Sequence, residues 1–271
     1  MKKFTVITAF NDNPTYKTFV GPAIKMWNKF GYDIKIAYIM DNETEDHGIE
    51  NLNEMAEIIP FKRIEGVDSG VQSKVSRMWL ASKQKDFLIT DVDLFVLNIK
   101  YMEDNWFSKY NETNILAIGG DHYAYKEEDE GKWPMYYTTG SGELLSKIIN
   151  LNNLEYEDWV LSNKGTKPIY DKKEDTGNPF PKFSDESLLR RLTFQSEYNN
   201  QVLRINRIKS LTPVNNLMTW SLEHYRRIDR TWAWTYNKEK LYDGWYIDCF
   251  PKRPLKKKDP VIKEIFKYLD L

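Results

Sequence analysis

The first part of the chain alternates between short apolar runs and stretches with apolar residues at helical spacing. Residues 3–10 are rich in β-branched and aromatic side chains, and residues 15–30 carry apolar side chains at nearly every third or fourth position. Because strands that alternate with helices form a parallel sheet covered on both faces, this pattern predicts an α/β fold. The expected strands lie at 3–10, 33–40 and 57–61, and the expected helices at 15–30, near 49–56 and at 70–82.

The remainder of the chain has a less regular pattern, without an internal repeat or a clear linker. An apolar run at 86–97 predicts a strand that contains two aspartates, and 114–119 predicts another strand. Polar stretches rich in Gly, Pro, Asn and charged residues predict loops at 121–134 and 160–183. Further helices are expected at 141–150, 184–195 and 260–270.

Asp91 and Asp93 are the most informative residues of the sequence. Carboxylates are rarely placed in a strand that otherwise appears buried, because removing a charge from water is costly. Residues two apart in a strand point to the same side, so the two carboxylates are expected to converge on one point. A divalent cation there would offset their repulsion, and oxygen ligands favour Mg²⁺ or Mn²⁺ with phosphates completing the shell. The alternative is a strand end at the surface with two solvated carboxylates.

Composition and charge exclude several classes of protein. The 39 basic and 40 acidic residues nearly balance, whereas dedicated nucleic-acid-binding proteins carry a basic excess. A single cysteine, Cys249, allows no intramolecular disulfide, which is typical of a reducing compartment. No stretch approaches the roughly 20 apolar residues of a membrane span. We therefore expect a soluble, cytoplasmic protein without a transmembrane segment.

At the aspartate pair the sequence resembles the GT-A glycosyltransferases. In that family an apolar strand ends in an Asp-x-Asp motif that binds Mn²⁺ or Mg²⁺ and the diphosphate of a nucleotide-sugar donor. Leu-Ile-Thr-Asp-Val-Asp at 88–93 resembles that element, which implies that Asp91 and Asp93 bind the metal and that both, with Val92 between them, contact the donor. The resemblance implies a Rossmann-like, mostly parallel central sheet flanked by helices. It also implies transfer of a sugar, from a UDP-sugar by preference, to a glycan or other hydroxyl acceptor.

The same resemblance implies one GT-A-like catalytic domain over residues 1–271. Residues 1–97 would form the half that binds the nucleotide sugar, and 98–255 a smaller half that binds the acceptor. Residues 256–271 would form a C-terminal helix. Trp133, Tyr136 and Tyr137 precede the helix at 141–150 and could stack on the acceptor, because aromatic faces suit sugars.

Three other segments resemble donor- and acceptor-side elements of the family. Residues 9–12 (Ala-Phe-Asn-Asp) resemble its first nucleotide-contacting loop, and the helix at 70–82 resembles one that presents basic side chains to the donor. The acidic start of the helix at 184–195 resembles the element beside the reacting sugar. Each segment has an alternative without a functional role. Residues 9–12 could be ordinary turn residues, the helix at 70–82 could present a solvated basic face, and the acids at 184–195 could simply suit the helix dipole. The resemblance implies donor contacts by Phe10, Asn11, Asp12, Gln72, Lys74 and Arg77, and an acceptor base at Asp185 or, second, Glu186.

The third metal ligand departs from the family pattern. Many members supply it from a histidine near the C-terminus, but Tyr-Ile-Asp-Cys-Phe-Pro-Lys-Arg-Pro at 246–254 contains none. The resemblance then implies Asp248 as the third ligand, with Lys252 or Arg253 on a phosphate. His224 is available in an amphipathic-looking segment.

Two other classes compete with this interpretation. A haloacid-dehalogenase-type phosphatase also uses Asp-x-Asp after an apolar strand, but normally near its N-terminus, whereas here about ninety residues precede the motif. A calcium-dependent carbohydrate-binding module without enzymatic activity would be mostly all-β, which the alternation of strands and helices disfavours. A P-loop kinase is disfavoured, because no Gly-x-x-x-x-Gly-Lys-Ser/Thr pattern occurs.

Overall fold

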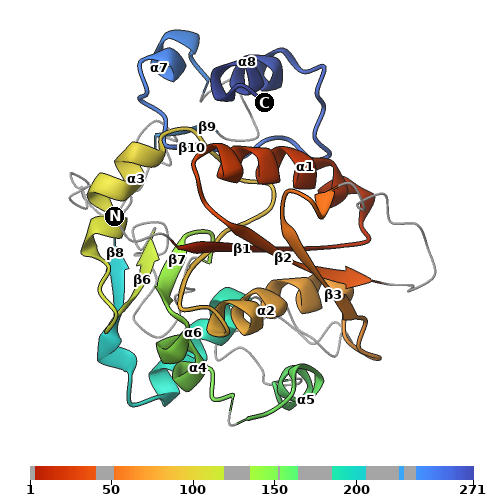
Figure 1. Cartoon of the computed structure of the whole chain (residues 1–271), viewed down its shortest axis with the longest axis vertical. Coiled ribbons are helices and arrows are strands. Elements are labelled where there is room, and N and C mark those ends of the chain that lie inside the picture. Colours follow the sequence, from red (N-terminus) through yellow and green to blue (C-terminus); the bar gives the residue numbers. More distant parts are fainter. Residues whose placement is uncertain are drawn as a thin grey trace, which may run out of the picture.

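The computed structural model describes residues 4–40, 52–118, 135–151, 153–163, 185–205, 226–228 and 236–271. Their main feature is a seven-stranded sheet in the order β3-β2-β1-β4-β7-β6-β8 (Figure 1). Four neighbouring pairs of strands are parallel and two are antiparallel, so the predicted α/β fold with a mostly parallel sheet is confirmed. The strands are β1 (Thr5–Asn11), β2 (Ile34–Met40), β3 (Glu57–Lys62), β4 (Asp86–Ile89), β6 (Ile115–Ile118), β7 (Thr138–Ser141) and β8 (Val202–Ile205).

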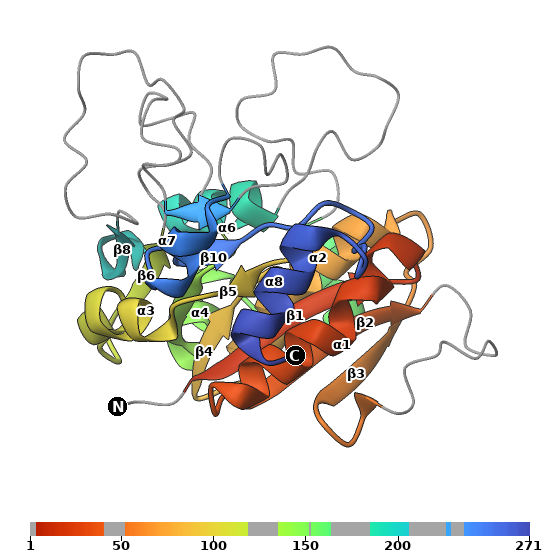
Figure 2. The ribbon, with the colours of Figure 1, turned by 90° about the horizontal axis from the view of Figure 1, so that it is seen from above.

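Helices cover both faces of the sheet, with α1 on one side and α2 on the other (Figure 1). Alternating side chains of β1 explain this, since Val6 packs with the α1 cluster and Ile7 with the α2 cluster. The C-terminal helix α8 lies beside α1 (Figure 2), where Lys29 donates a 2.6 Å hydrogen bond to the Leu269 carbonyl. The helices are α1 (Pro14–Lys29), α2 (Ser69–Ser82), α3 (Ile99–Asn105), α4 (Gly142–Ile148), α5 (Tyr156–Ser162), α6 (Asp185–Gln195), α7 (Lys238–Tyr242) and α8 (Pro260–Leu269).

The strand expected at 86–97 is wrong in its middle. Strand β4 ends at Ile89, a turn follows, and Phe95–Val96 forms β5 of a second, three-stranded sheet. There β5 pairs with β10 (Asp248–Cys249), which in turn pairs with β9 (Arg227–Ile228). Asp91 and Asp93 therefore lie in the connection between two sheets, and strand alternation does not determine where their carboxylates point.

Several boundaries differ from the sequence prediction. Residues 138–141 form a strand rather than only the approach to α4, while Ser141 caps that helix by accepting from the Leu144 amide. Gly142 is required there, since a Cβ would lie 1.9 Å from the Gln84 carbonyl oxygen. The helix expected near 49–56 is described only from residue 52, where the chain makes a turn. Helices α3, α5 and α7 were not expected, and α5 extends to Ser162, into the loop predicted at 160–183.

Some predictions fall outside the described residues. These are the loop at 121–134, most of the loop at 160–183, Trp133 and His224. In the part of the chain that is described, no helix has the length and apolar character needed to cross a membrane.

Candidate functional site

A cleft of about 380 Å³ opens at the carboxyl ends of β1 and β4, next to the first turn of α2. This is the edge at which open α/β sheets bind ligands, because the loops that follow parallel strands gather there. The cleft brings together nine residues that the sequence predicted for the site. They are Phe10, Asn11, Lys74, Arg77, Asp91, Val92, Asp93, Asp185 and Glu186.

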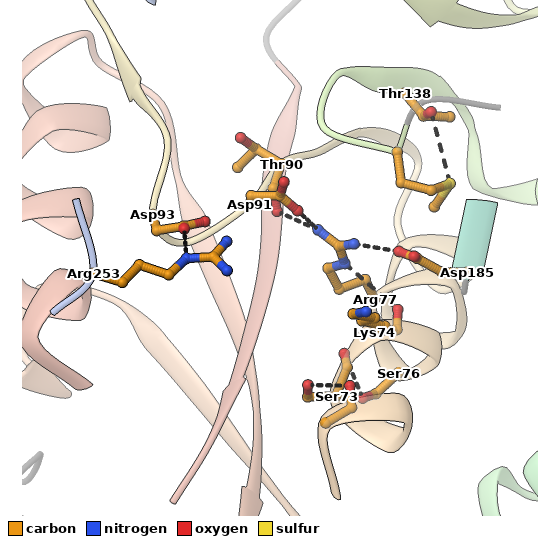
Figure 3. Close-up of polar contacts among 12 residues, drawn as sticks. Ser73, Lys74, Ser76, Arg77, Thr90, Asp91, Asp93, Thr138, Asp185 and Arg253 are labelled. Atoms are coloured by element: carbon orange, nitrogen blue, oxygen red, sulfur yellow. Dashed lines mark hydrogen bonds and ion pairs between the residues drawn. The ribbon is translucent and has the colours of Figure 1, made fainter. Parts of the chain in front are cut away.

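Arg77 is the buried centre of this cleft. Its guanidinium donates to the Thr90 carbonyl at 2.9 Å, to Asp91 Oδ1 at 2.5 Å and to Asp185 Oδ2 (Figure 3). Burial opposes the charge, but Asp185 and Asp91 outweigh it and hold the pKa of Arg77 above its ordinary value. The arginine thus joins α2, the turn after β4 and the start of α6 in one network.

Asp93 is bound by a second arginine. The residue is only 1% exposed, and its Oδ2 accepts a hydrogen bond from Nε of Arg253 (Figure 3). The Arg253 side chain is one-third exposed, and its guanidinium lies 4.8 Å from the centre of the Tyr16 ring. Burial lowers the pKa of Arg253, but the hydrogen bond to Asp93 and the charges of Asp93 and Asp91 raise it by more. The alternative of two solvated carboxylates does not describe Asp93.

Five predicted residues do not line the cleft. Tyr137, expected to stack on the acceptor, is fully buried in the hydrophobic core, where its ring packs against Trp106. Gln72 is buried and holds the chain before α2, accepting from the Ile64 amide at 3.0 Å and donating to the Lys62 carbonyl at 2.8 Å. Asp12 accepts from the Tyr38 hydroxyl and pairs with Lys17 at 2.8 Å. Lys252 is exposed, and the neighbouring Arg253 takes the place on the cleft instead.

Asp248, expected as the third metal ligand, is the fifth of these residues. It is completely buried, and its two carboxylate oxygens accept from Nε and a terminal nitrogen of Arg227 at 2.7 and 3.0 Å. Since a guanidinium already binds both oxygens of this carboxylate, Asp248 serves the packing of β9 against β10, and its assignment as a metal ligand is not kept.

The lining of the cleft carries an excess of negative charge. Its described residues include three basic side chains and five carboxylates, a formal excess of two negative charges. A polyanion would be repelled from such a lining unless a cation accompanied it. The carboxylates are Asp68, Asp91, Asp93, Asp185 and Glu186, and the basic residues are Lys74, Arg77 and Arg253.

The donor set at the turn after β4 fits a hard divalent cation. Asp91 and Asp93 line the same cleft and offer carboxylate oxygens, and Mg²⁺ needs only one or two carboxylates when phosphates and waters supply the rest. Within the described ranges no three His, Cys, Asp or Glu side chains form a group able to hold a metal. The site therefore suits a cation shared with a bound phosphate better than a cation enclosed by protein.

The structure adds lining residues that sequence reasoning missed or left as second choices. Tyr16 and Ser73 were not singled out, and Tyr136 was expected only as an acceptor platform. Arg253 stood beside Lys252 as an equal alternative. The sequence indicated a basic side chain at 252 or 253, because Lys252 and Arg253 are neighbours. Only the path of the backbone after β10 determines which of the two faces the cleft.

Comparisons with known proteins give distant structural matches alone. No protein-family model matches the sequence, and the search of curated proteins found no match. A galactosyltransferase, LgtC, in complex with donor and acceptor sugar analogs is 11% identical, with 98% of this chain and 95% of that chain covered and a TM-score of 0.49. The glycosyltransferase GlyE of Streptococcus pneumoniae TIGR4 is 13% identical, covering 100% of this chain and 61% of that chain at a TM-score of 0.46.

A third match is the inositol-1-phosphate CTP transferase from T. maritima, which is 9% identical and has a TM-score of 0.42. That alignment covers 76% of this chain and 86% of the other. At such identities and scores these likenesses identify no family and transfer no activity. The side chains of the cleft are therefore the basis for a function of this chain.

Proposed function

We propose that this protein is a glycosyltransferase of the GT-A type. It would transfer a sugar from a nucleotide-sugar donor, with UDP preferred, to a glycan or other hydroxyl acceptor, using Mn²⁺ or Mg²⁺. One observation supports this proposal above all others. Asp91 and Asp93 line a cleft at the carboxyl ends of two parallel strands, beside Arg77 and Arg253, in a lining with a net negative charge.

The charge distribution suits the chemistry of a diphosphate leaving group. Asp91 and Asp93 would hold the divalent cation, which when bound supplies charge neutralisation at the leaving diphosphate. Lys74 is exposed on α2 and lines the same cleft, so it can approach a bound phosphate. Arg77 is fixed by three acceptors, so it adds a positive charge that needs no reorganisation during the reaction.

The two acids at the start of α6 suit different tasks. Asp185 is buried and its Oδ2 accepts from Arg77, so it orients that guanidinium. This bond gives Asp185 a positioning role toward Arg77. Glu186 lines the cleft and is partly exposed. In an inverting reaction we therefore propose Glu186, ahead of Asp185, as the base for the acceptor hydroxyl.

Neither rival class gains support from the site. The parallel sheet is unlike the mostly all-β architecture expected of a calcium-dependent carbohydrate-binding module. A haloacid-dehalogenase-type phosphatase would use the first aspartate as a nucleophile. Asp91 Oδ1 is bound by Arg77 at 2.5 Å, which reduces its reactivity as a nucleophile.

A thermal-shift screen of nucleotide sugars, with Mn²⁺ and with EDTA, tests the proposed function. We expect one UDP-sugar to raise the melting temperature by about 5 °C or more at a hundredfold excess over its Kd, and only with Mn²⁺. The reason is mass action, since a ligand that binds only the folded protein stabilises it. If no nucleotide sugar shifts the melting temperature while a generic phosphate ester is hydrolysed, the phosphatase reading replaces this one.

A further inference from the structure

The two arginines of the cleft are held in different ways. Arg77 is buried and donates to acceptors on the turn after β4 and on α6, so no single change of partner would release it. Arg253 is one-third exposed and donates to Asp93 (Figure 3). Beyond that bond the structure gives Arg253 a stacking contact with the Tyr16 ring.

The backbone that carries Arg253 is fixed while its side chain reaches into the cleft. On one side the Phe250 amide donates to the Ile228 carbonyl at 2.8 Å. On the other side the Leu255 amide donates to Oγ1 of Thr18 at 3.1 Å. Since both ends of this short segment are anchored, a change of partner for Arg253 requires only rotation of its long side chain.

A cation on the aspartate pair competes with this guanidinium. Asp93 is almost completely buried, so a divalent ion on the oxygen that binds Arg253 would bring two positive charges together where little water screens them. An arginine released from Asp93 would remain within the cleft that it lines. Its planar fork then matches the oxygens of a phosphate as well as it matched a carboxylate.

We propose that Arg253 is an exchangeable partner: it neutralises Asp93 in the ligand-free protein and passes to the donor diphosphate when a divalent cation takes that carboxylate. This inference rests on the proposed function and deepens it. The exchange keeps the buried Asp93 paired in both states. It also couples binding of the cation to binding of the donor. The cation releases Arg253 to bind a phosphate, and the bound phosphate keeps Arg253 away from the Asp93 carboxylate.

If the exchange occurs, replacing Arg253 should change the affinities for Mn²⁺ and for UDP in opposite directions. In the variant Arg253→Gln the competitor of the cation is lost, so Mn²⁺ alone should bind about fivefold more tightly than to the wild-type protein. The same variant lacks the phosphate contact, so UDP at saturating Mn²⁺ should bind about tenfold more weakly. Electron paramagnetic resonance of free Mn²⁺ measures the first affinity, and calorimetry with UDP measures the second.

Two further variants separate exchange from general charge effects. Lys257→Gln removes one positive charge from an exposed position in the same C-terminal segment and should leave both affinities unchanged. Arg253→Lys keeps the competing charge, so its affinity for Mn²⁺ alone should stay near the wild-type value while UDP binding weakens. Far-UV circular dichroism and the melting temperature check that each variant is folded.

The outcomes distinguish this inference from the proposed function. Tighter Mn²⁺ binding together with weaker UDP binding in Arg253→Gln supports the exchange. Unchanged or weaker Mn²⁺ binding in that variant, while the wild-type protein still binds UDP with Mn²⁺, overturns the exchange and leaves the function standing. Absence of Mn²⁺-dependent UDP binding by the wild-type protein overturns both.

Discussion

Replacement of Asp93 by asparagine is expected to lower the affinity for UDP in the presence of Mn²⁺ by at least about a hundredfold. The side chain is 1% exposed and lines the cleft, so its full charge acts at short range on whatever occupies the site. Asparagine keeps the size and one acceptor oxygen but removes the charge that a divalent cation requires. Isothermal titration of UDP into the variant at saturating Mn²⁺ measures the loss.

The matching control is Asp104→Asn on α3. Asp104 is an exposed carboxylate that pairs with Lys100 at 2.9 Å, so this variant removes the same charge away from the cleft. Its UDP affinity should equal that of the wild-type protein. The variant Asp91→Asn should lose binding as Asp93→Asn does, although Asp91 is partly exposed and paired with Arg77. Wild-type affinity in both cleft variants would remove the aspartate pair from the site.

Replacement of Arg227 by methionine is expected to lower the free energy of unfolding by about 3–5 kcal/mol. Asp248 is completely buried, and two hydrogen bonds from Arg227 compensate its charge. Burial opposes ionisation of Arg227, but Asp248 more than offsets this and holds the pKa of Arg227 above its ordinary value. Methionine preserves much of the volume but removes both hydrogen bonds and the positive charge beside the buried carboxylate. Guanidinium chloride denaturation of the purified variant measures the change.

An ion pair with an exposed lysine and a partly exposed glutamate provides the comparison. Lys238 and Glu264 lie 3.3 Å apart, and Lys238→Met should cost less than about 1 kcal/mol because water screens the charges. The double variant Arg227→Met with Asp248→Leu should recover much of the lost stability, since no buried charge remains unpaired. A cost for Arg227→Met no larger than that for Lys238→Met would show that the buried pair does not matter to the fold.

The effect of this pair extends to the cleft. The Arg227 guanidinium lies 5.0 Å from the centre of the Tyr136 ring and 5.0 Å from that of Phe250. Tyr136 forms part of the cleft wall, and Phe250 begins the segment that carries Arg253. The carboxylate that the sequence suggested for the metal thus supports, through Arg227, two sides of the site without reaching it.

The first half of the fold was predictable because its signals are local. In β1 and β2 the apolar run is bounded by turn residues, and Asn13 caps α1 by accepting from the Thr15 amide at 2.9 Å. Gly31 follows that helix with a φ of 77°, as expected for a glycine beyond a helix end. Such signals depend on a few neighbouring residues, so the sequence alone carries them.

The strand at 86–97 could not be divided correctly from the sequence. Phe87 to Ile89 and Leu94 to Leu97 are equally apolar on either side of the aspartates, so the pattern fits one long strand. The second run leaves the sheet because Phe95 and Val96 pair with Cys249 and Asp248, about 150 residues later. A contact at that separation leaves no trace in local periodicity.

The candidate site, like the fold, was predictable from the sequence only where it depends on neighbouring residues. The sequence interpretation placed a divalent cation at Asp93, and the family resemblance added Asp248 as a ligand, whereas the structure gives each carboxylate an arginine partner. The sequence does not choose between a metal and a guanidinium, since the partner of Asp93 lies 160 residues away. The predicted division of the chain at residues 97 and 255 stays a prediction.

The most direct test of the aspartate cleft is calorimetric titration of UDP into the wild-type protein, once with saturating Mn²⁺ and once with EDTA. We predict one binding site with Mn²⁺ and at least about a hundredfold weaker binding with EDTA, because the lining has an excess of negative charge. Equal affinity under both conditions, or no binding under either, would contradict a cleft in which two carboxylates hold a nucleotide diphosphate through a shared cation.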